Sequence, residues 1–228
     1  MGANRHRITT INKEGFLTLT ITFAALAVLN IILFIPGIYG IGSWIVLGLS
    51  LTIAGIMVNF FKNPHRHFPS EDRDKVVVSS ADGVIVAIEE VDETEYFHDR
   101  RIVVSTFMNL FNVHANWYPV NGTVVKVSHQ EGHFFAADKP KSSIENERAM
   151  IVIETEDGQE VMVRQIAGMM ARRIVTYPSV GDRCHIDQHL GFIKFGSRVD
   201  IYLPLGSLVC VKMGEKVKAD LDIIAKLP

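Results

Sequence analysis

Three polar residues of this sequence could together activate a hydroxyl group. Asp82 lies in the run Ser-Ser-Ala-Asp-Gly, His114 in Phe-Asn-Val-His-Ala-Asn-Trp, and Ser197 in Phe-Gly-Ser-Arg. A carboxylate can orient an imidazole, and the imidazole can then take the proton of a serine. Each residue also has an ordinary explanation, because Asp82 and Ser197 fit turns and His114 fits a hydrogen-bonded core position. The residue types alone leave both interpretations open.

The pair Gly196–Ser197 stands inside the run Phe-Ile-Lys-Phe-Gly-Ser-Arg-Val-Asp-Ile-Tyr-Leu-Pro, residues 192–204. Apolar and polar residues alternate on both sides of the pair, which indicates two half-buried strands. The pair is therefore expected at a bend, where glycine allows backbone conformations closed to other residues. A serine oxygen placed there can attack the carbonyl carbon of its own preceding residue. An ordinary β-turn is the simpler alternative.

The N-terminal quarter of the chain has the composition of a membrane hairpin. Residues 16–35 carry no charge and are numerous enough to cross a hydrocarbon core of roughly 30 Å. A second uncharged run follows at 41–61, and basic residues flank both runs. We expect a basic segment at 1–15 and a membrane-associated helical hairpin at 16–61. The positive flanks predict that the rest of the chain lies on the cytoplasmic side, and a re-entrant pair within one leaflet is the competing geometry.

The remaining residues, 62–228, form a series of short β runs separated by turn residues, without a long amphipathic helical pattern. We predict a mainly β fold, in which the hairpin precedes a compact β-sandwich or barrel-like domain. The strands are expected within these ranges: 75–91, 101–107, 113–117, 122–127, 149–154, 160–167, 173–177, 192–204 and 208–213.

Composition excludes several classes of protein. A net charge of −2 and a pI near 6.5 give no electrostatic footprint for nucleic acid. The two cysteines, Cys184 and Cys210, lack the spacing of a zinc site or a disulfide framework, which favours a reducing compartment. Two His-x3-His pairs, at 129/133 and 185/189, lie in strand or turn context, so we expect no metal site.

Several further segments occur in a characteristic order together with the Gly196–Ser197 run. They are residues 80–83, 108–114, 119–124, 146–148, 165–168 and 171–173. With the apolar N-terminus, they give a chain that resembles the short, pyruvoyl-dependent phosphatidylserine decarboxylase proenzymes over nearly its whole length.

The resemblance implies a self-cleaving enzyme of the cell membrane. Asp82 would hold His114, His114 would deprotonate Ser197, and the Ser197 oxygen would attack the Gly196 carbonyl. Cleavage would leave a heterodimer of chains 1–196 and 197–228, with Ser197 converted to a covalent pyruvoyl group. That group would form a Schiff base with the substrate amine and replace PLP as the electron sink. The implied reaction converts phosphatidylserine to phosphatidylethanolamine among membrane lipids, with His114 as candidate proton donor and with neither metal nor PLP.

Two departures from the family pattern affect these expectations. Phe111 replaces a second histidine found in many members, so any role of that histidine is not carried over. Many longer members have Leu-Gly-Ser with Ser or Thr next, whereas here Phe195 precedes Gly196 and Arg198 follows Ser197. Arg198 could bind the substrate carboxylate or phosphate, or it could be a charge on the strand surface.

Other hypotheses concern the substrate and the class of protein. The same chemistry could act on another seryl phospholipid, such as an archaetidylserine-like ether lipid. A membrane-tethered biotinyl or lipoyl carrier with Lys212 as its modified residue is the rival class, but it gives Asp82 and His114 no role. The segment Phe60–Arg66 is expected to anchor at the interface through aromatic side chains and basic residues that meet lipid head groups.

Overall fold

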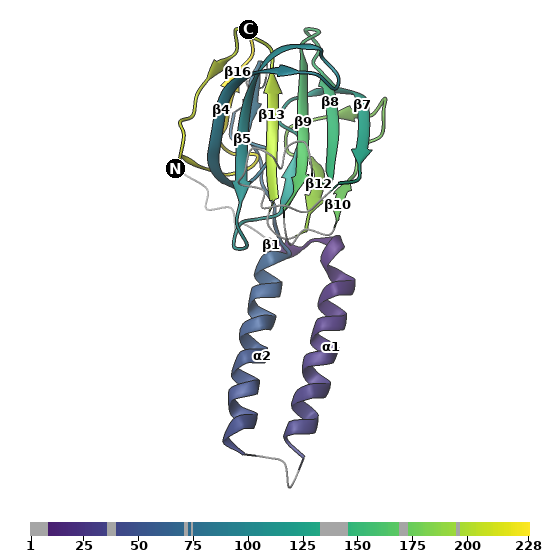
Figure 1. Ribbon diagram of the computed structural model, residues 1–228, viewed down its shortest axis with the longest axis vertical. Coiled ribbons are helices and arrows are strands. Elements are labelled where there is room, and N and C mark those ends of the chain that lie inside the picture. Colours follow the sequence, from purple (N-terminus) through teal and green to yellow (C-terminus); the bar gives the residue numbers. More distant parts are fainter. Residues whose placement is uncertain are drawn as a thin grey trace. The chain divides into compact units, whose positions relative to one another are not determined.

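The computed structural model shows an apolar helical pair that is followed along the chain by a β domain (Figure 1). It describes residues 9–35, 40–70, 73, 75–132, 146–168, 173–194 and 197–228, so Gly196 lies outside the described residues. The chain divides into two compact units, Met1–His65 and Arg66–Pro228. The predicted fold class, mainly β with an N-terminal helical hairpin, is confirmed.

The first unit contains two long helices, α1 (Phe16–Leu33) and α2 (Ile41–Phe60). Both have the length and apolar composition of membrane-spanning helices, with mean hydropathies of 2.3 and 2.1. The short strands β1 (Thr9–Ile11) and β2 (Lys62–Pro64) pair antiparallel, and a 3-10 turn, η1 (Lys13–Gly15), leads into α1. The chain segments before α1 and after α2 are thereby paired with each other.

Polar side chains connect the two apolar helices. The Asn30 side-chain amide donates to Ser50 Oγ at 2.9 Å, and Ser43 Oγ donates to the Leu33 carbonyl oxygen at 2.9 Å. Because lipid tails are as apolar as leucine, interhelical hydrogen bonds and close packing, rather than hydrophobic burial, hold such helices together. The hairpin is therefore a specific helix pair.

The second unit is built on an eight-stranded antiparallel sheet that curls into a half-barrel (Figure 1). Its strand order is β11-β7-β8-β9-β13-β5-β4-β15. The bounds, in chain order, are β4 (Gly83–Glu93), β5 (Asp99–Met108), β7 (Gly122–Gln130), β8 (Arg148–Glu154), β9 (Glu160–Ala167), β11 (Arg183–Cys184), β13 (Ser197–Leu203) and β15 (Lys216–Val217).

Two three-stranded antiparallel sheets complete the domain. One has the order β10-β12-β6, formed by β10 (Ile174–Thr176), β12 (His189–Ile193) and β6 (Ala115–Trp117). The other has the order β14-β16-β3, formed by β14 (Leu208–Val209), β16 (Ile223–Lys226) and β3 (Val76–Val78). The strand ranges expected from the sequence do not include β1, β2, β11, β15 and β16, which have two to four residues each and do not lie inside a longer alternating run.

The main core lies on one face of the eight-stranded sheet. On β13 this face carries Val199, Ile201 and Leu203, which belong to the largest buried apolar cluster. The opposite face carries Tyr202, which packs in a second cluster with Val103 and Met162. Successive residues of a strand point to opposite faces, and this alternation also separates the polar residues of β13.

Candidate active site

Ser197 begins β13, in the middle of the eight-stranded sheet. Its backbone pairs with Met108 at the end of β5 on one side and with Ala167 at the end of β9 on the other. The residue is fully buried, and among the residues that the structure describes its Oγ has no hydrogen-bond partner. Burying a hydroxyl without a partner costs about 1–3 kcal/mol. Such groups are rare in folded proteins, so Ser197 is a candidate for a chemical role.

His114 is fully buried just before β6. Its Nδ1 lies 3.1 Å from the carbonyl oxygen of Asn112. Because a carbonyl oxygen can only accept, this contact assigns the hydrogen to Nδ1, which in a neutral imidazole leaves a lone pair on Nε2. That tautomer is the form that a general base requires.

The Asn112 carbonyl is held by a compact turn. Asn112 Oδ1 accepts from the backbone N–H of Asn109 at 2.9 Å, and Asn109 Oδ1 accepts from the N–H of Phe111, also at 2.9 Å. The asparagines of this segment thus form a turn, which is typical of this residue type. Phe111, at the position of the missing second histidine, is 65% exposed.

Strand β12 joins His114 to the segment that leads to Ser197. The backbone N–H of Ile193 donates to the His114 carbonyl at 3.2 Å. The ring of Phe192 lies 6.5 Å from the imidazole, centroid to centroid, and Phe192 pairs with Ala115. Ile193 is only four residues before Ser197. The structure therefore brings His114 beside the run that contains Gly196 and Ser197.

Asp82 is buried, but it contacts residues other than His114. Arg66 meets it with both terminal guanidinium nitrogens, one of them at 2.8 Å, and the backbone N–H of Ala219 donates to Oδ1 at 2.9 Å. Within the described part of the chain, Arg66 and Ala219 are the partners of Asp82, and no hydrogen bond joins it to His114. The contact of Arg66 with Asp82 was not expected from the sequence, because Arg66 follows an apolar run and matches a basic membrane flank.

Buried amide side chains form hydrogen bonds at the end of β9, beside Ser197. Asn116 Oδ1 accepts from Gln165 Nε2 at 2.8 Å. Asn146 Nδ2 donates to the carbonyl of Ala167 at 2.7 Å, next to Ser197 in the sheet. The sequence segments 146–148 and 165–168 thus come together at the end of β9. These contacts hold the end of β9, one of the two strands that flank Ser197.

Arg198 lies on the other face of β13. It forms two hydrogen bonds with Asp200, at 2.8 and 2.9 Å, and both side chains are almost fully buried. The pair borders a pocket of about 370 Å³ on the sheet face that also carries Arg164 and Tyr202. The structure therefore does not bring the Arg198 side chain together with Ser197.

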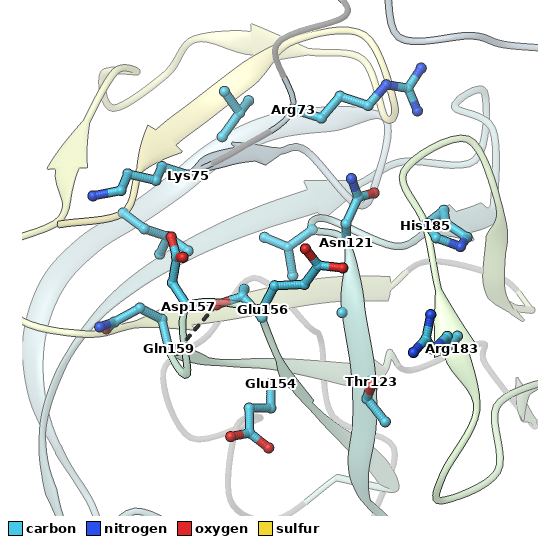
Figure 2. Close-up of a pocket in the computed structure, with 15 residues that line it drawn as sticks. Arg73, Lys75, Asn121, Thr123, Glu154, Glu156, Asp157, Gln159, Arg183 and His185 are labelled. Atoms are coloured by element: carbon cyan, nitrogen blue, oxygen red, sulfur yellow. Dashed lines mark hydrogen bonds between the residues drawn. The ribbon is translucent and has the colours of Figure 1, made fainter.

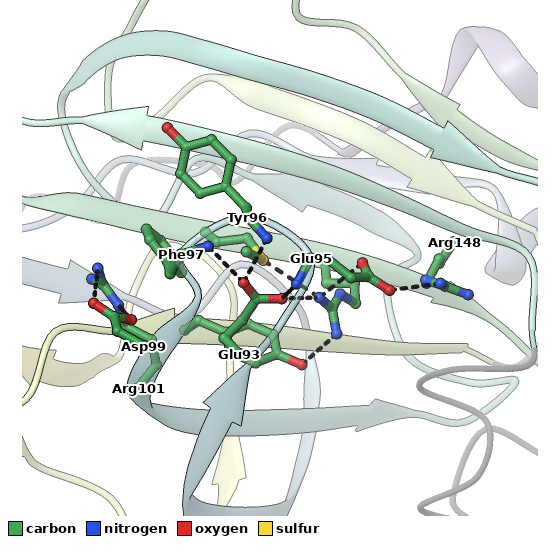
Figure 3. Close-up of polar contacts among 10 residues, drawn as sticks. Glu93, Glu95, Tyr96, Phe97, Asp99, Arg101 and Arg148 are labelled. Carbon is green, nitrogen blue, oxygen red and sulfur yellow. Dashed lines mark hydrogen bonds and ion pairs between the residues drawn. The ribbon is translucent and has the colours of Figure 1, made fainter.

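The sheet face that carries Arg198 also contains a network of charged side chains (Figure 3). Arg164 contacts Glu93 at 3.0 Å and Glu95 at 3.1 Å, and Arg148 contacts Glu95 at 2.6 Å. Burial alone would raise the pKa of Glu93, but three backbone N–H groups and Arg164 lower it. These charges are paired with one another, which indicates a structural network.

A second pocket, of about 320 Å³, has charges of both signs in its walls (Figure 2). Its charged side chains include Arg73, Lys75, Glu154, Asp157 and Arg183. The described residues that line it do not include Asp82, His114 or Ser197. Within the described ranges, no group of three or more His, Cys, Asp or Glu side chains could hold a metal ion.

Comparison with known proteins identifies a family that this chain resembles over most of its length. A sequence model described as phosphatidylserine decarboxylase matches residues 53–225. The phosphatidylserine decarboxylase proenzyme of Bacteroides fragilis is 56% identical over 217 residues, which cover 95% of each chain. The proenzyme of Bacteroides thetaiotaomicron is 54% identical over the same length and coverage. That of Amoebophilus asiaticus is 42% identical over 219 residues, 95% of this chain and 96% of the relative.

Proposed function

This chain belongs to the phosphatidylserine decarboxylase family, and we propose that it converts phosphatidylserine to phosphatidylethanolamine with a pyruvoyl group made from its own Ser197. The observation that carries the proposal is the Ser197 hydroxyl, which is fully buried and without a partner among the described residues. It lies at the start of a central strand, between Met108 of segment 108–114 and Ala167 of segment 165–168.

The surroundings of Ser197 fit a group that must be shielded from water. The residue is fully buried between Met108 and Ala167, so an electrophilic carbonyl at this position would be protected by the sheet. A pyruvoyl carbonyl supplies a site for the substrate amine and a sink for the electrons left by loss of CO2. The chain's own residues must form the group, hold the substrate and move the proton.

Self-cleavage is assigned to His114 and Ser197. With Nδ1 hydrogen-bonded to the Asn112 carbonyl, His114 can take the Ser197 proton at Nε2. The Ser197 Oγ then attacks the Gly196 carbonyl carbon, and the Gly196–Ser197 C–N bond breaks, which leaves an ester and a free amine on residue 197. Elimination would break the ester bond to the Cβ of residue 197 and free the Gly196 carboxylate, which divides the chain into residues 1–196 and 197–228. Water would then convert the dehydroalanine at position 197 to the pyruvoyl group, with release of ammonia.

The two chains would stay together, because β13 pairs with β5 and β9 of the larger chain along its length. We propose that His114 also returns the proton during decarboxylation.

The apolar helices account for access to a lipid substrate. We propose that α1 and α2 hold the enzyme at the cell membrane and that the β domain lies on its cytoplasmic side. A diacyl lipid reacts at the bilayer surface, so attachment raises the local substrate concentration. Basic residues flank both apolar runs, which supports this orientation.

The proposed reaction is tested with purified full-length protein and vesicles that contain phosphatidylserine. We expect release of CO2 and formation of phosphatidylethanolamine, and we expect Ser197→Ala to form none. His185→Asn is the matched control and should retain activity, because His185 lines the separate pocket of Figure 2. Product formation by Ser197→Ala at the wild-type rate would overturn the proposal. Vesicles with an ether-linked seryl lipid, run in parallel, distinguish the diacyl substrate from an ether-linked one.

A further inference from the structure

We propose that Arg66 is a positioning residue of this enzyme, which fixes Asp82 and, through Trp117, the strand that begins beside His114. The inference rests on the proposed function, because it concerns the self-cleavage and catalysis assigned to Ser197. It gives Arg66 an internal role in place of the head-group contact that its place in the sequence indicates.

The first observation is the two-point contact between Arg66 and Asp82. Both guanidinium nitrogens reach the carboxylate, and the two side chains are only 9% and 13% exposed. A two-point contact between a planar guanidinium and a carboxylate fixes orientation as well as distance. Arg66 also donates to the Ala219 carbonyl at 2.8 Å, while the Ala219 N–H donates to Asp82 at 2.9 Å. The three residues therefore form a closed set of contacts.

The second observation links this set to His114. The Arg66 guanidinium carbon lies 4.8 Å from the centroid of the Trp117 ring, within the range of a cation–π contact. The Trp117 backbone N–H donates to the Ser80 carbonyl at 3.0 Å, two residues before Asp82. Trp117 is thus held to the Asp82 turn through both its ring and its backbone.

Trp117 lies on β6, three residues after His114. Strand β6 pairs with β12, which leads toward Ser197. A displacement of Arg66 would therefore loosen the Asp82 turn and β6 together, and with them His114. A shift of about 1 Å in a catalytic group can slow a reaction by about 100-fold.

Arg73 provides a matched control. It also pairs with a partly buried aspartate in the same domain, since its guanidinium contacts Asp187 at 2.8 Å. Neither residue of that pair contacts Asp82 or Trp117 within the described residues. A loss of general stability should affect variants of Arg66 and Arg73 alike, whereas a loss of positioning should affect only Arg66.

The experiment follows the appearance of chains 1–196 and 197–228 in full-length protein held in detergent. We expect Arg66→Ala to slow cleavage about 100-fold and millimolar guanidinium to restore part of the rate. Arg66→Lys keeps the charge but not the two-point contact, so it should fall between Arg66→Ala and the wild type. Arg73→Ala should cleave at a rate close to the wild type, with or without guanidinium. If Arg66→Ala does not fold, Arg66→Lys and its response to guanidinium decide the question.

Several outcomes would overturn the inference. One is wild-type cleavage in both Arg66 variants. Another is a slow variant that guanidinium does not rescue and whose melting temperature falls as far as that of Arg73→Ala. Weaker binding to phosphatidylserine vesicles with normal cleavage in detergent would show that Arg66 contacts head groups instead. An uncleaved wild-type chain would overturn the proposed function itself, so the two failures are distinguishable.

Discussion

Arg198 forms a two-point ion pair with Asp200, two residues further along β13, and both side chains lie on the sheet face opposite to Ser197. Ser197 shares its face with Val199 and Ile201 of the main core, whereas Arg198 and Asp200 border a separate pocket. The backbone of β13 therefore separates the Arg198 side chain from the Ser197 hydroxyl, although the two residues are adjacent in the sequence. We assign Arg198 a structural role, the neutralisation of a buried carboxylate.

Loss of Arg198 should therefore reduce stability. Arg198→Ala would leave Asp200 buried without its cation, which typically costs about 3–5 kcal/mol in the free energy of unfolding. The change is measured as a lower melting temperature in detergent. The double variant Arg198→Met with Asp200→Leu should recover most of the loss, because no buried charge remains. A normally stable Arg198→Ala with a raised KM for phosphatidylserine would contradict this role and indicate a substrate contact.

His114 should be required for cleavage. Replacement by alanine removes the general base, which typically contributes about 10²- to 10⁴-fold to the rate. The cleavage rate should fall by that factor, and uncleaved chain should accumulate. The rate is followed by the separation of the two chains in a denaturing gel. His185→Ala serves as the control, since His185 lies at the pocket of Figure 2. Equal cleavage rates in the two variants would rule out His114 as the base.

Gly83 should tolerate no side chain. A Cβ at this position would lie 2.1 Å from the carbonyl oxygen of Phe107 on the neighbouring strand. Gly83→Ala must separate β4 from β5 and should cost on the order of 1–3 kcal/mol. Because Asp82 directly precedes Gly83, cleavage should also slow. Gly48→Ala in α2 is the control, since its Cβ would meet open space, and a similar effect of both changes would argue against this explanation.

Asp220 should make stability depend on pH. Burial raises its pKa from the ordinary 3.8 to about 6, although the Asp187 N–H and the cations Arg66 and Arg73 act in the opposite direction. The folded protein then binds this proton more tightly than the unfolded chain. Its contribution to the free energy of unfolding is therefore complete below pH 3.8 and is lost as the pH rises through 6.

Asp220→Asn should remove this dependence. We expect a higher melting temperature at pH 7. Between pH 4 and 6 the free energy of unfolding should change less with pH than in the wild type, and the difference should be at most about 3 kcal/mol. Asp187 has the opposite sign, because its hydrogen bond from Phe68 and its contact with Arg73 outweigh burial and lower its pKa. Asp187→Asn should therefore destabilise the protein at neutral pH. An unchanged profile in Asp220→Asn would contradict the assignment.

The strands and their faces were largely predictable from the sequence. Alternation predicted the β domain and the strand that contains residues 197–203. It did not predict that Arg198 is buried beside Asp200, because a charge in an alternating run is expected on the strand surface. The Arg66–Asp82 pair was not predictable, because Arg66 matches a membrane flank and Asp82 a turn, and no local pattern relates them. The pairing of Ser197 with Met108 and Ala167 also depends on strand register, which sequence periodicity does not specify between distant segments.

Self-cleavage between Gly196 and Ser197 is tested by the denatured mass of the purified protein, measured beside that of Ser197→Ala. We expect the wild type to separate into chains of residues 1–196 and 197–228, and we expect the smaller chain to be blocked to N-terminal sequencing. Ser197→Ala should remain a single chain of about 25.5 kDa. An active wild-type preparation that consists only of the intact 25.5 kDa chain would contradict the central claim.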